Sequence, residues 1–394
     1  HPQSSFSALS VCQFLKKFHI PVDMLIALCL FKYFPYGGLQ RDFLAIGKEL
    51  YKRGHQIRVY TRSWQGDKPS EFDIIEVPVR AFSNHSANER YYEWVKKHLD
   101  KHPVNKIVGF NKMPGLDYYY AADVCYIKKT LLEKKGIFYR LTARYHHYCN
   151  YEKFVFEPSS STKILALTEQ QILDYQTHYK TQSQRFHLLP PGISKDRKYN
   201  NLPKCNKAQL CNELKISNCK TILLQVGSAF HRKGVDRSIE ALSSLPSNER
   251  EQTHLIVIGQ DDQAQFLKLA QKKKVSHLVH FFEGRDDIPK FIACADLLLH
   301  PARSETAGIV ILEALVGGLP QIVTEECGYS TYVKFANSGI VLQTPFDQTK
   351  FNLELEKYIT NSEKEKYSTN AKIWADSHDM YSLPTKAADV ILNT

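Results

Sequence analysis

The sequence predicts an α/β protein made of two doubly wound domains that face each other across a cleft. Short runs of β-branched and apolar residues alternate with segments of helical period, a pattern that is typical of parallel sheets covered by helices. The alternation stops at Pro190-Pro191-Gly192, which breaks regular structure, and then starts again. A chain of 394 residues is long enough for two such domains.

The boundaries follow from the same pattern. Residues 1–23 lack a continuous apolar segment and a small-residue cleavage site, so we expect an extension outside the fold rather than a signal peptide. The first domain is expected over residues 24–190 and the second over 191–374. The tail, residues 375–394, follows the final predicted strand, and we expect it to pack back on the first domain.

In the first half, strand candidates are apolar runs of four to seven residues, and helix candidates show apolar residues at helical spacing, one of them closed by Gly54. The predicted strands are Leu25–Leu30, Gln56–Tyr60, Asp73–Val79, Lys106–Phe110, Lys163–Leu167 and Phe186–Leu189. The predicted helices are Leu39–Arg53, Asn88–Leu99, Thr130–Phe156 and Glu169–Tyr179.

The second half repeats the alternation, with helices between the strands. The predicted strands are Thr221–Val226, His254–Ile258, Val279–Phe282, Asp296–His300 and Gln321–Thr324. In open parallel sheets, ligands bind beyond the carboxyl ends of the strands, so the cleft between the two sheets is the expected binding site.

Composition narrows the classes of partner. The net charge of +11 favours an anionic partner, which could be nucleic acid, an acidic membrane surface or a phosphorylated substrate. Nine scattered cysteines without a CxxC pair indicate reduced thiols in the cytoplasm and argue against zinc. The sequence has no run of eighteen apolar residues, so no membrane-spanning helix is predicted.

The first motif is Gly37-Gly38, where a predicted strand passes into a helix. Paired glycines allow positive φ and a close approach of the backbone to a ligand at a helix N-terminus. The motif is not GxGxxG, which disfavours a dinucleotide cofactor. The alternative is a plain strand-to-helix turn.

The second motif follows the first strand of the second domain, where Arg232 and Lys233 stand between Gly227 and Gly234. A forked donor and a point charge at a strand's carboxyl end suit a diphosphate. An exposed Arg-Lys pair without function is the alternative.

The third motif places two carboxylates, Glu305 and Glu313, on either side of a loop that turns into a helix. Ala307 and Gly308 let the backbone approach a ligand, and the free N–H groups near Ile309 suit a phosphate. Ionised glutamates accept hydrogen bonds from sugar hydroxyls. Together the three motifs fit a nucleotide sugar, whereas the third alone is also compatible with a solvated loop and an ordinary helix.

No Asp-x-Asp pair occurs in the sequence, so the motif that usually binds the metal ion of a nucleotide diphosphate is missing. We expect no metal and no cofactor, because fixed cations can stabilise the diphosphate instead.

Residues 126–156 interleave basic and aromatic side chains. Such a segment suits an anionic membrane surface, although it is also compatible with single-stranded nucleic acid or with a helix packed on the sheet. The candidate membrane-interacting residues are Lys128, Lys129, Lys134, Lys135, Arg140 and Arg144.

These motifs, with Gly318-Leu319-Pro320 before a late strand, resemble glycosyltransferase family 4 from Met24 to the C-terminus. The stretches Tyr33–Phe43, Val108–Asp117 and Ala121–Tyr126 are similar to members that act on the lipopolysaccharide core. The resemblance implies the GT-B fold of two Rossmann-like domains, the first binding the acceptor and the second the nucleotide sugar. It further implies transfer of glucose from UDP-glucose to an inner-core heptose in an α-1,3 linkage, with retention of configuration.

The resemblance also suggests roles for single residues. Arg232 and Lys233 would stabilise the departing diphosphate, because preorganised donors at a leaving group lower the barrier. Glu305 would hold sugar hydroxyls, Glu313 the ribose, and Arg285 the uracil unless it is an exposed turn residue. No acid is singled out as a nucleophile, and front-face attack is the usual proposal in this family. The acids expected near the acceptor hydroxyl are Asp42 and Asp123, each of which could instead end a strand or start a helix.

A lipid-linked acceptor favours the membrane over nucleic acid as the partner of the basic segment. The expected location is therefore the cytoplasm, peripherally bound to the cytoplasmic face of the inner membrane. Three alternatives stay open: a transferase with another donor or acceptor, a sugar-nucleotide epimerase or hydrolase of the same fold, and a non-catalytic basic module.

Overall fold

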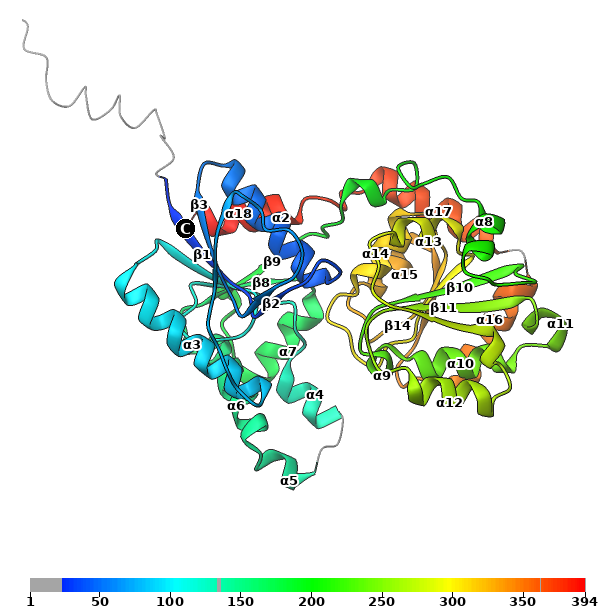
Figure 1. Cartoon of the computed structure of the whole chain (residues 1–394), viewed down its shortest axis with the longest axis horizontal. Coiled ribbons are helices and arrows are strands. Elements are labelled where there is room, and N and C mark those ends of the chain that lie inside the picture. Colours follow the sequence, from blue (N-terminus) through cyan, green and yellow to red (C-terminus); the bar gives the residue numbers. More distant parts are fainter. Residues whose placement is uncertain (1–22, 133–135, 362, 394) are drawn as a thin grey trace, which may run out of the picture.

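The computed structural model describes residues 23–132, 136–361 and 363–393. Within these residues the chain forms two α/β domains side by side, the first in blue to green and the second in green to orange (Figure 1). The predicted α/β architecture with two parallel sheets is confirmed. Apart from Asp23, the expected N-terminal extension lies outside the described residues.

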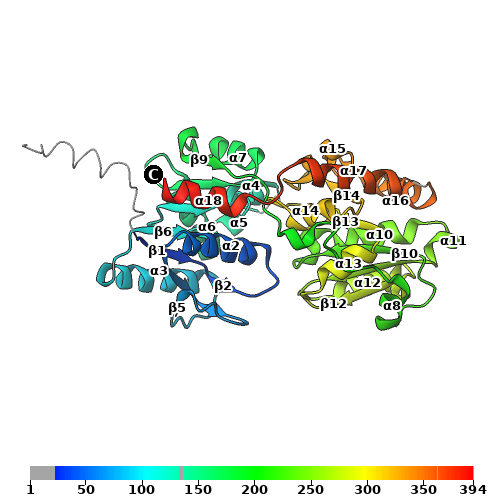
Figure 2. The same cartoon turned by 90° about the horizontal axis from the view of Figure 1, so that it is seen from above.

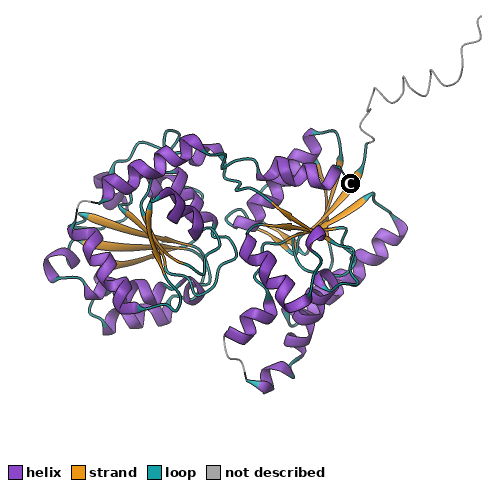
Figure 3. Ribbon diagram, turned by 180° about the vertical axis from the view of Figure 1, so that it is seen from behind, coloured by secondary structure: helices purple, strands orange, loops and turns teal. Residues whose placement is uncertain are grey.

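In the first sheet β1 is an inner strand, and both of its neighbours are parallel to it. β1 is almost wholly buried because helices cover both faces of the sheet (Figure 3). The strands, in sheet order, are β5 (Phe72–Glu76), β3 (Gln56–Thr61), β1 (Leu25–Cys29), β6 (Lys106–Gly109), β7 (Tyr118–Tyr120), β8 (Lys163–Ala166) and β9 (Phe186–Leu188). A small parallel pair, β2 (Lys32–Tyr33) and β4 (Ser63–Trp64), lies beside it.

Helix α2 buries one apolar face, on which Phe43, Ile46 and Leu50 recur at helical spacing. The helices are α2 (Gly38–Lys52), α3 (Asn84–Lys101), α4 (Tyr126–Leu132), α5 (Ile137–Arg140), α6 (Ala143–Phe156), α7 (Glu169–Tyr179) and the 3₁₀ turn η1 (Ser183–Arg185).

The second sheet is also parallel, and its central strands β10 and β13 pair with each other. In sheet order its strands are β12 (Val279–Phe282), β11 (Thr253–Ile258), β10 (Thr221–Val226), β13 (Leu297–His300), β14 (Gln321–Thr324) and β15 (Gly339–Leu342). The helices that surround it are η2 (Lys195–Arg197), α8 (Lys207–Glu213), α9 (Phe230–Lys233), α10 (Val235–Ser244), α11 (Ser247–Arg250), α12 (Ala264–Lys272), η3 (Ser276–Leu278), α13 (Ile288–Cys294), α14 (Ile309–Val316), α15 (Ser330–Ala336), α16 (Gln348–Thr360) and α17 (Lys364–Ser377).

The prediction of one helix over Thr130–Phe156 is wrong. The backbone is extended at Gly136, and α6 starts after Thr142, whose hydroxyl accepts a hydrogen bond from the Tyr145 N–H at 3.2 Å. A threonine that caps a new helix ends the previous one.

Four strands were not predicted: the two-residue strands β2 and β4, and the longer strands β7 and β15. β7 consists of Tyr118, Tyr119 and Tyr120, three buried tyrosines, and it is too short to show a period. β15, Gly339–Leu342, is apolar but only four residues long; it starts at a glycine and forms the edge of its sheet.

The chain crosses between the domains twice, and the two crossings lie against each other. The N–H of Ile193 donates to the Met380 carbonyl at 2.8 Å, and the N–H of Leu383 donates to the Pro191 carbonyl at 3.3 Å. A Cβ on Gly192 would lie 2.3 Å from the Leu383 Cβ, so this contact needs a glycine. The crossings form a two-stranded connection.

The C-terminal helix α18 (Leu383–Leu392), in red, returns to the first domain and packs beside α2 (Figures 1 and 2). Leu383 and Ile391 are fully buried there, and Arg53 of α2 forms an ion pair with Asp389 at 2.8 Å. Apolar contact therefore carries most of the attachment, since a half-exposed ion pair contributes little.

We expect Ile391→Ala to lower the free energy of unfolding of the first domain by about 2–5 kcal/mol, because it leaves a cavity between α18 and the sheet. Arg53→Gln, the control, should cost less than about 1 kcal/mol. Urea unfolding followed by circular dichroism measures both. A larger loss in the arginine variant would show that charge, not packing, holds the tail.

Candidate active site

A cavity of about 550 Å³ opens between the domains, at the carboxyl ends of strands from both sheets. The first domain contributes Asn111, Lys112 and Asp123 to its lining, and the second contributes Arg232 and Glu305. The expected cleft therefore exists, and it brings residues of the second and third sequence motifs to one place.

Glu305 is the centre of a charge cluster in this cavity. Its carboxylate accepts hydrogen bonds from Lys233 Nζ and, at 2.9 Å, from Arg232 Nη1. Burial alone would raise the pKa of Glu305, but the charges of Lys233 and Arg232 hold that pKa well below its usual range. Glu305 therefore stays ionised at neutral pH. Arg232 also donates a hydrogen bond to the Ser304 carbonyl at 2.8 Å.

His300 lies directly behind this cluster, at the end of β13. It is fully buried, and its Nε2 is 3.9 Å from the nearer Glu305 oxygen, which is too far for a hydrogen bond. Burial, assisted by the nearby charge of Lys233, lowers the pKa of His300 to about 4. The imidazole is therefore neutral at physiological pH.

The loop after Glu305 leads into α14 through Gly308, whose φ of +88° places it in the left-handed region. A Cβ on Gly38 of α2 would lie 2.7 Å from Ile309 Cδ1, so the two domains touch at the start of α14. Ala307 is buried beside them. The predicted close approach at Gly38 is thus a contact with the other domain.

Neither Gly37 nor Gly38 has positive φ, contrary to the conformation suggested for this turn. Gly37 caps α2 with an extended backbone, at φ −85° and ψ 139°. A Cβ there would meet the Gln40 side chain, so space rather than backbone conformation favours the glycine.

Glu313 lies at the junction of the domains and is only 4% exposed. Its carboxylate forms an ion pair with Arg41 of α2, and Arg197 Nη1 lies 3.7 Å away. The structure thus gives Glu313 two arginine partners, of which Arg41 follows the Gly37-Gly38 motif and Arg197 belongs to none of the three motifs. Its contact with a ribose stays a prediction.

Arg285 does not line the cavity. Its guanidinium forms two hydrogen bonds with the Asp287 carboxylate, at 2.7 and 2.8 Å, and stands 5.0 Å from the centre of the Phe291 ring. These contacts hold it near the second sheet's edge, and its role at a uracil stays a prediction.

Of the two acids expected near the acceptor, Asp123 lines the cavity and Asp42 does not. Asp42 is 7% exposed, and the Tyr120 hydroxyl donates a hydrogen bond to its carboxylate. Burial raises the pKa of Asp42 to about 6, against the opposing effect of Tyr120. Asp42 therefore packs in the core, whereas Asp123 faces the cavity, and its contact with an acceptor stays a prediction.

The backbone at Asp123 is held by helices behind it. Its carbonyl accepts hydrogen bonds from Gln171 Nε2 and from the Tyr175 hydroxyl, both at 3.2 Å. Glu152, fully buried, accepts bonds from Lys112 Nζ and from the Tyr126 N–H at the start of α4. In the sequence, Glu152 is one of only two acids, with Glu133, in a segment rich in basic and aromatic residues.

The basic segment carries its cations in different settings. Lys128 is paired with both oxygens of Asp174, at 2.7 and 2.8 Å, whereas Arg140 is exposed. Arg144 stands 5.7 Å over the Tyr148 ring, and both Arg144 and Lys129 line the cavity. Lys134 and Lys135 lie outside the described residues.

Large apolar side chains are exposed along the same segment, which projects from the first domain at the α4–α5 end (Figures 1 and 3). We call this group the α4–α5 patch: Leu131, Leu132, Ile137, Phe138 and Leu141, which are 48–82% exposed. Exposed apolar groups of this kind mark interaction surfaces.

Two kinds of structure are absent from the described residues. None of the helices there is both long enough and apolar enough to cross a bilayer. In the same residues, histidine, cysteine and acidic side chains do not gather in threes as a metal site requires.

His300 makes stability depend on pH. The pKa of His300 in the folded chain, about 4, lies below the ordinary value of 6.5, so the unfolded chain takes up the proton first as the pH falls. The contribution of the neutral imidazole to the free energy of unfolding is therefore complete above pH 6.5 and is lost as the pH falls toward 4. When the pH is lowered from 7 to 5, we expect the free energy of unfolding of His300→Gln to fall by about 2 kcal/mol less than that of the wild type. Urea unfolding at the two pH values tests this, and equal losses would contradict it.

Comparisons with known proteins agree with this geometry. The model of the glycosyl transferases group 1 matches residues 206–374, the part that carries the Glu305 cluster. The lipopolysaccharide glucosyltransferase WaaG of Escherichia coli (strain K12) is 52% identical over 369 residues, which cover 93% of this chain and 98% of WaaG.

A crystal structure of WaaG, a glycosyltransferase involved in lipopolysaccharide biosynthesis, matches with a TM-score of 0.90 and 51% identity over 93% of this chain and 99% of that chain. The Anabaena protein Alr3699/HepE, solved with UDP and glucose, has a TM-score of 0.70 at 16% identity over 94% of this chain and 100% of that chain, and shares the fold. The chain therefore belongs to the group 1 glycosyl transferases, in the family of WaaG, and has their GT-B fold.

Proposed function

We propose that the protein transfers glucose from UDP-glucose to a heptose of the lipopolysaccharide inner core, forming an α-1,3 linkage with retention of configuration. The observation that carries the proposal is the cluster of Glu305, Arg232 and Lys233 at a cavity shared by both domains. The name of the 52% identical relative, a lipopolysaccharide glucosyltransferase, supports the choice of donor sugar and acceptor.

On the donor side, the second domain binds the nucleotide sugar. The diphosphate is bound by hydrogen bonds that the N–H groups at the start of α14 and the cations Arg232 and Lys233 donate. Its negative charge grows as the C1–O bond breaks, so these donors stabilise the transition state. Glu305 holds both cations in place before the donor arrives, and it then accepts hydrogen bonds from sugar hydroxyls. Glu313, beside Arg41, contacts the ribose.

On the acceptor side, Asp123 takes part in removing the proton of the attacking hydroxyl, because it lines the cavity opposite Glu305. The attack occurs on the face from which the diphosphate leaves, so configuration is retained without a covalent intermediate. Two fixed cations neutralise the leaving group, and we propose that no metal ion is required.

The α4–α5 patch places the enzyme on an anionic membrane, at the cytoplasmic face of the inner membrane, where a lipid-linked acceptor is found. Apolar side chains enter the interface, and exposed cations such as Arg140 interact with lipid headgroups. Lys128 contributes less, since Asp174 already neutralises it.

The first test of the function is a panel of UDP-sugars and truncated core lipopolysaccharide, with product mass and linkage as the measurement. We expect Glu305→Gln to reduce kcat by about 10²–10³, because it releases the cations that stabilise the leaving group. Glu313→Gln should raise the donor KM, and EDTA should leave the rate unchanged. Glu365→Gln, an exposed acid of α17, is the control.

Other results would overturn parts of this proposal. UDP release without added acceptor would indicate a hydrolase, and a rate abolished by EDTA and restored by magnesium would refute metal independence. A KM effect from Glu305 and a kcat effect from Glu313 would exchange their roles.

Membrane binding has its own test. We expect the triple variant Ile137→Ser, Phe138→Ser, Leu141→Ser to bind anionic vesicles at least tenfold more weakly, because three apolar groups no longer enter the bilayer. The matched control is Ile373→Ser, Phe335→Ser, Leu353→Ser, which changes the same residue types where they are exposed on the second domain. Vesicle sedimentation is the measurement, and equal losses in both variants would exclude the patch.

A further inference from the structure

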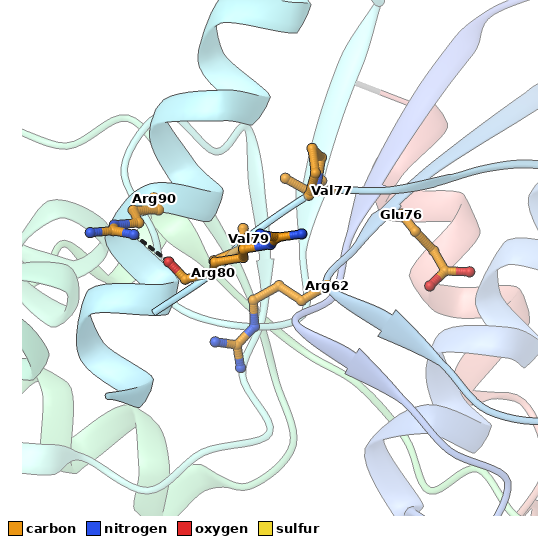
Figure 4. Close-up of a pocket in the computed structure, with 7 residues that line it drawn as sticks. Arg62, Glu76, Val77, Val79, Arg80 and Arg90 are labelled. Carbon is orange, nitrogen blue, oxygen red and sulfur yellow. Dashed lines mark hydrogen bonds between the residues drawn. The ribbon is translucent and has the colours of Figure 1, made fainter. Parts of the chain in front are cut away.

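A second cavity, of about 530 Å³, lies in the first domain where β3 and β5 end and α3 begins (Figure 4). Three of the residues that line it are arginines, Arg62, Arg80 and Arg90, and one is an acid, Glu76. The carboxyl ends of parallel strands are binding positions in this fold, so the cavity has the right place for a ligand.

The charge of Arg62 is not neutralised by the protein. Within the described residues its guanidinium has no ion pair, and its buried Nε has no hydrogen-bond partner. The guanidinium stands 5.2 Å from the centre of the Phe31 ring, and burial lowers its pKa. A half-buried cation without a counterion is stabilised by an anion that binds beside it.

The other charges around the cavity leave it positive. Glu76 is paired with Lys68, and Figure 4 shows its carboxylate directed away from the Arg62 guanidinium. Arg90 donates a hydrogen bond to the Arg80 carbonyl, which ties the loop after β5 to α3. The Arg80 side chain is exposed and has no ion pair among the described residues.

Arg62 also lines the cavity between the domains, together with Asp123 and Glu305. The two cavities therefore meet at this side chain. A molecule that offers a hydroxyl beside Asp123 can extend past Arg62 and reach the other two arginines.

We propose that Arg62, Arg80 and Arg90 form a subsite for an anionic group of the acceptor, a phosphate or carboxylate on a sugar next to the one that is glucosylated. The inference rests on the proposed transfer to a core oligosaccharide. Guanidinium groups bind such oxyanions through paired hydrogen bonds, so the subsite selects acceptors by charge.

The test compares two soluble acceptors: deacylated core oligosaccharide, and the same material after dephosphorylation and reduction of its carboxylates. The measurement is the ratio of kcat/KM for the anionic acceptor to that for the neutral one. We expect Arg62→Gln to lower this ratio about 10- to 100-fold and Arg80→Gln to lower it less, since Arg80 is exposed. Arg250→Gln, in the second domain, is the matched control and should keep the wild-type ratio.

An unchanged kcat/KM ratio in both Arg62→Gln and Arg80→Gln would overturn the proposal. Variants that lose only their binding to anionic vesicles would also overturn it, because the arginines would then bind lipid headgroups. Arg80→Gln keeps the test open if Arg62→Gln does not fold. If the wild type glucosylates neither acceptor, the proposed function fails, and titration with inorganic phosphate then decides the subsite. Binding weakened by Arg62→Gln but not by Arg250→Gln supports it, and equal binding refutes it.

Discussion

Burial of the Glu305 carboxylate is the constraint on which the charged side of the cavity between the domains depends. A buried carboxylate without partners would be protonated or would destabilise the fold, and here it stays ionised because Lys233 and Arg232 approach it. The pairing ties the loop after β13 to α9, which follows β10. Two cations and the start of α14 thereby face one cavity, and the neutral His300 behind them adds no competing positive charge.

The junction of the domains is built from the same region. Packing of Ile309 on Gly38 and the ion pair of Glu313 with Arg41 join α14 to α2, and a continuous apolar cluster runs through both domains. The site is therefore assembled only when the domains meet. The cluster of Glu305, Arg232 and Lys233 belongs wholly to the second domain. Asp123 belongs to the first, where Gln171 and Tyr175 hold its carbonyl.

Much of the fold could be predicted from the sequence, because strand and helix periods are local. The errors are local as well: the tyrosine strand β7 is too short to show a period, and Thr142 starts a new helix within a continuous pattern. The motifs at Arg232 and Glu305 were predicted as parts of one site, but their direct ion pair joins residues 73 positions apart. The Arg41–Glu313 pair spans 272 positions, and only the packed structure could reveal it.

The double crossing between the domains has a mechanical consequence. A single linker lets two domains rotate about many axes. Two crossings joined by the hydrogen bonds of Ile193 and Leu383 restrict this rotation and act as a hinge. Bending about the line that joins them is allowed, whereas twisting would break these bonds and separate Gly192 from Leu383. We therefore expect the cleft to open along one arc and the two halves of the site to return to the same register on closure.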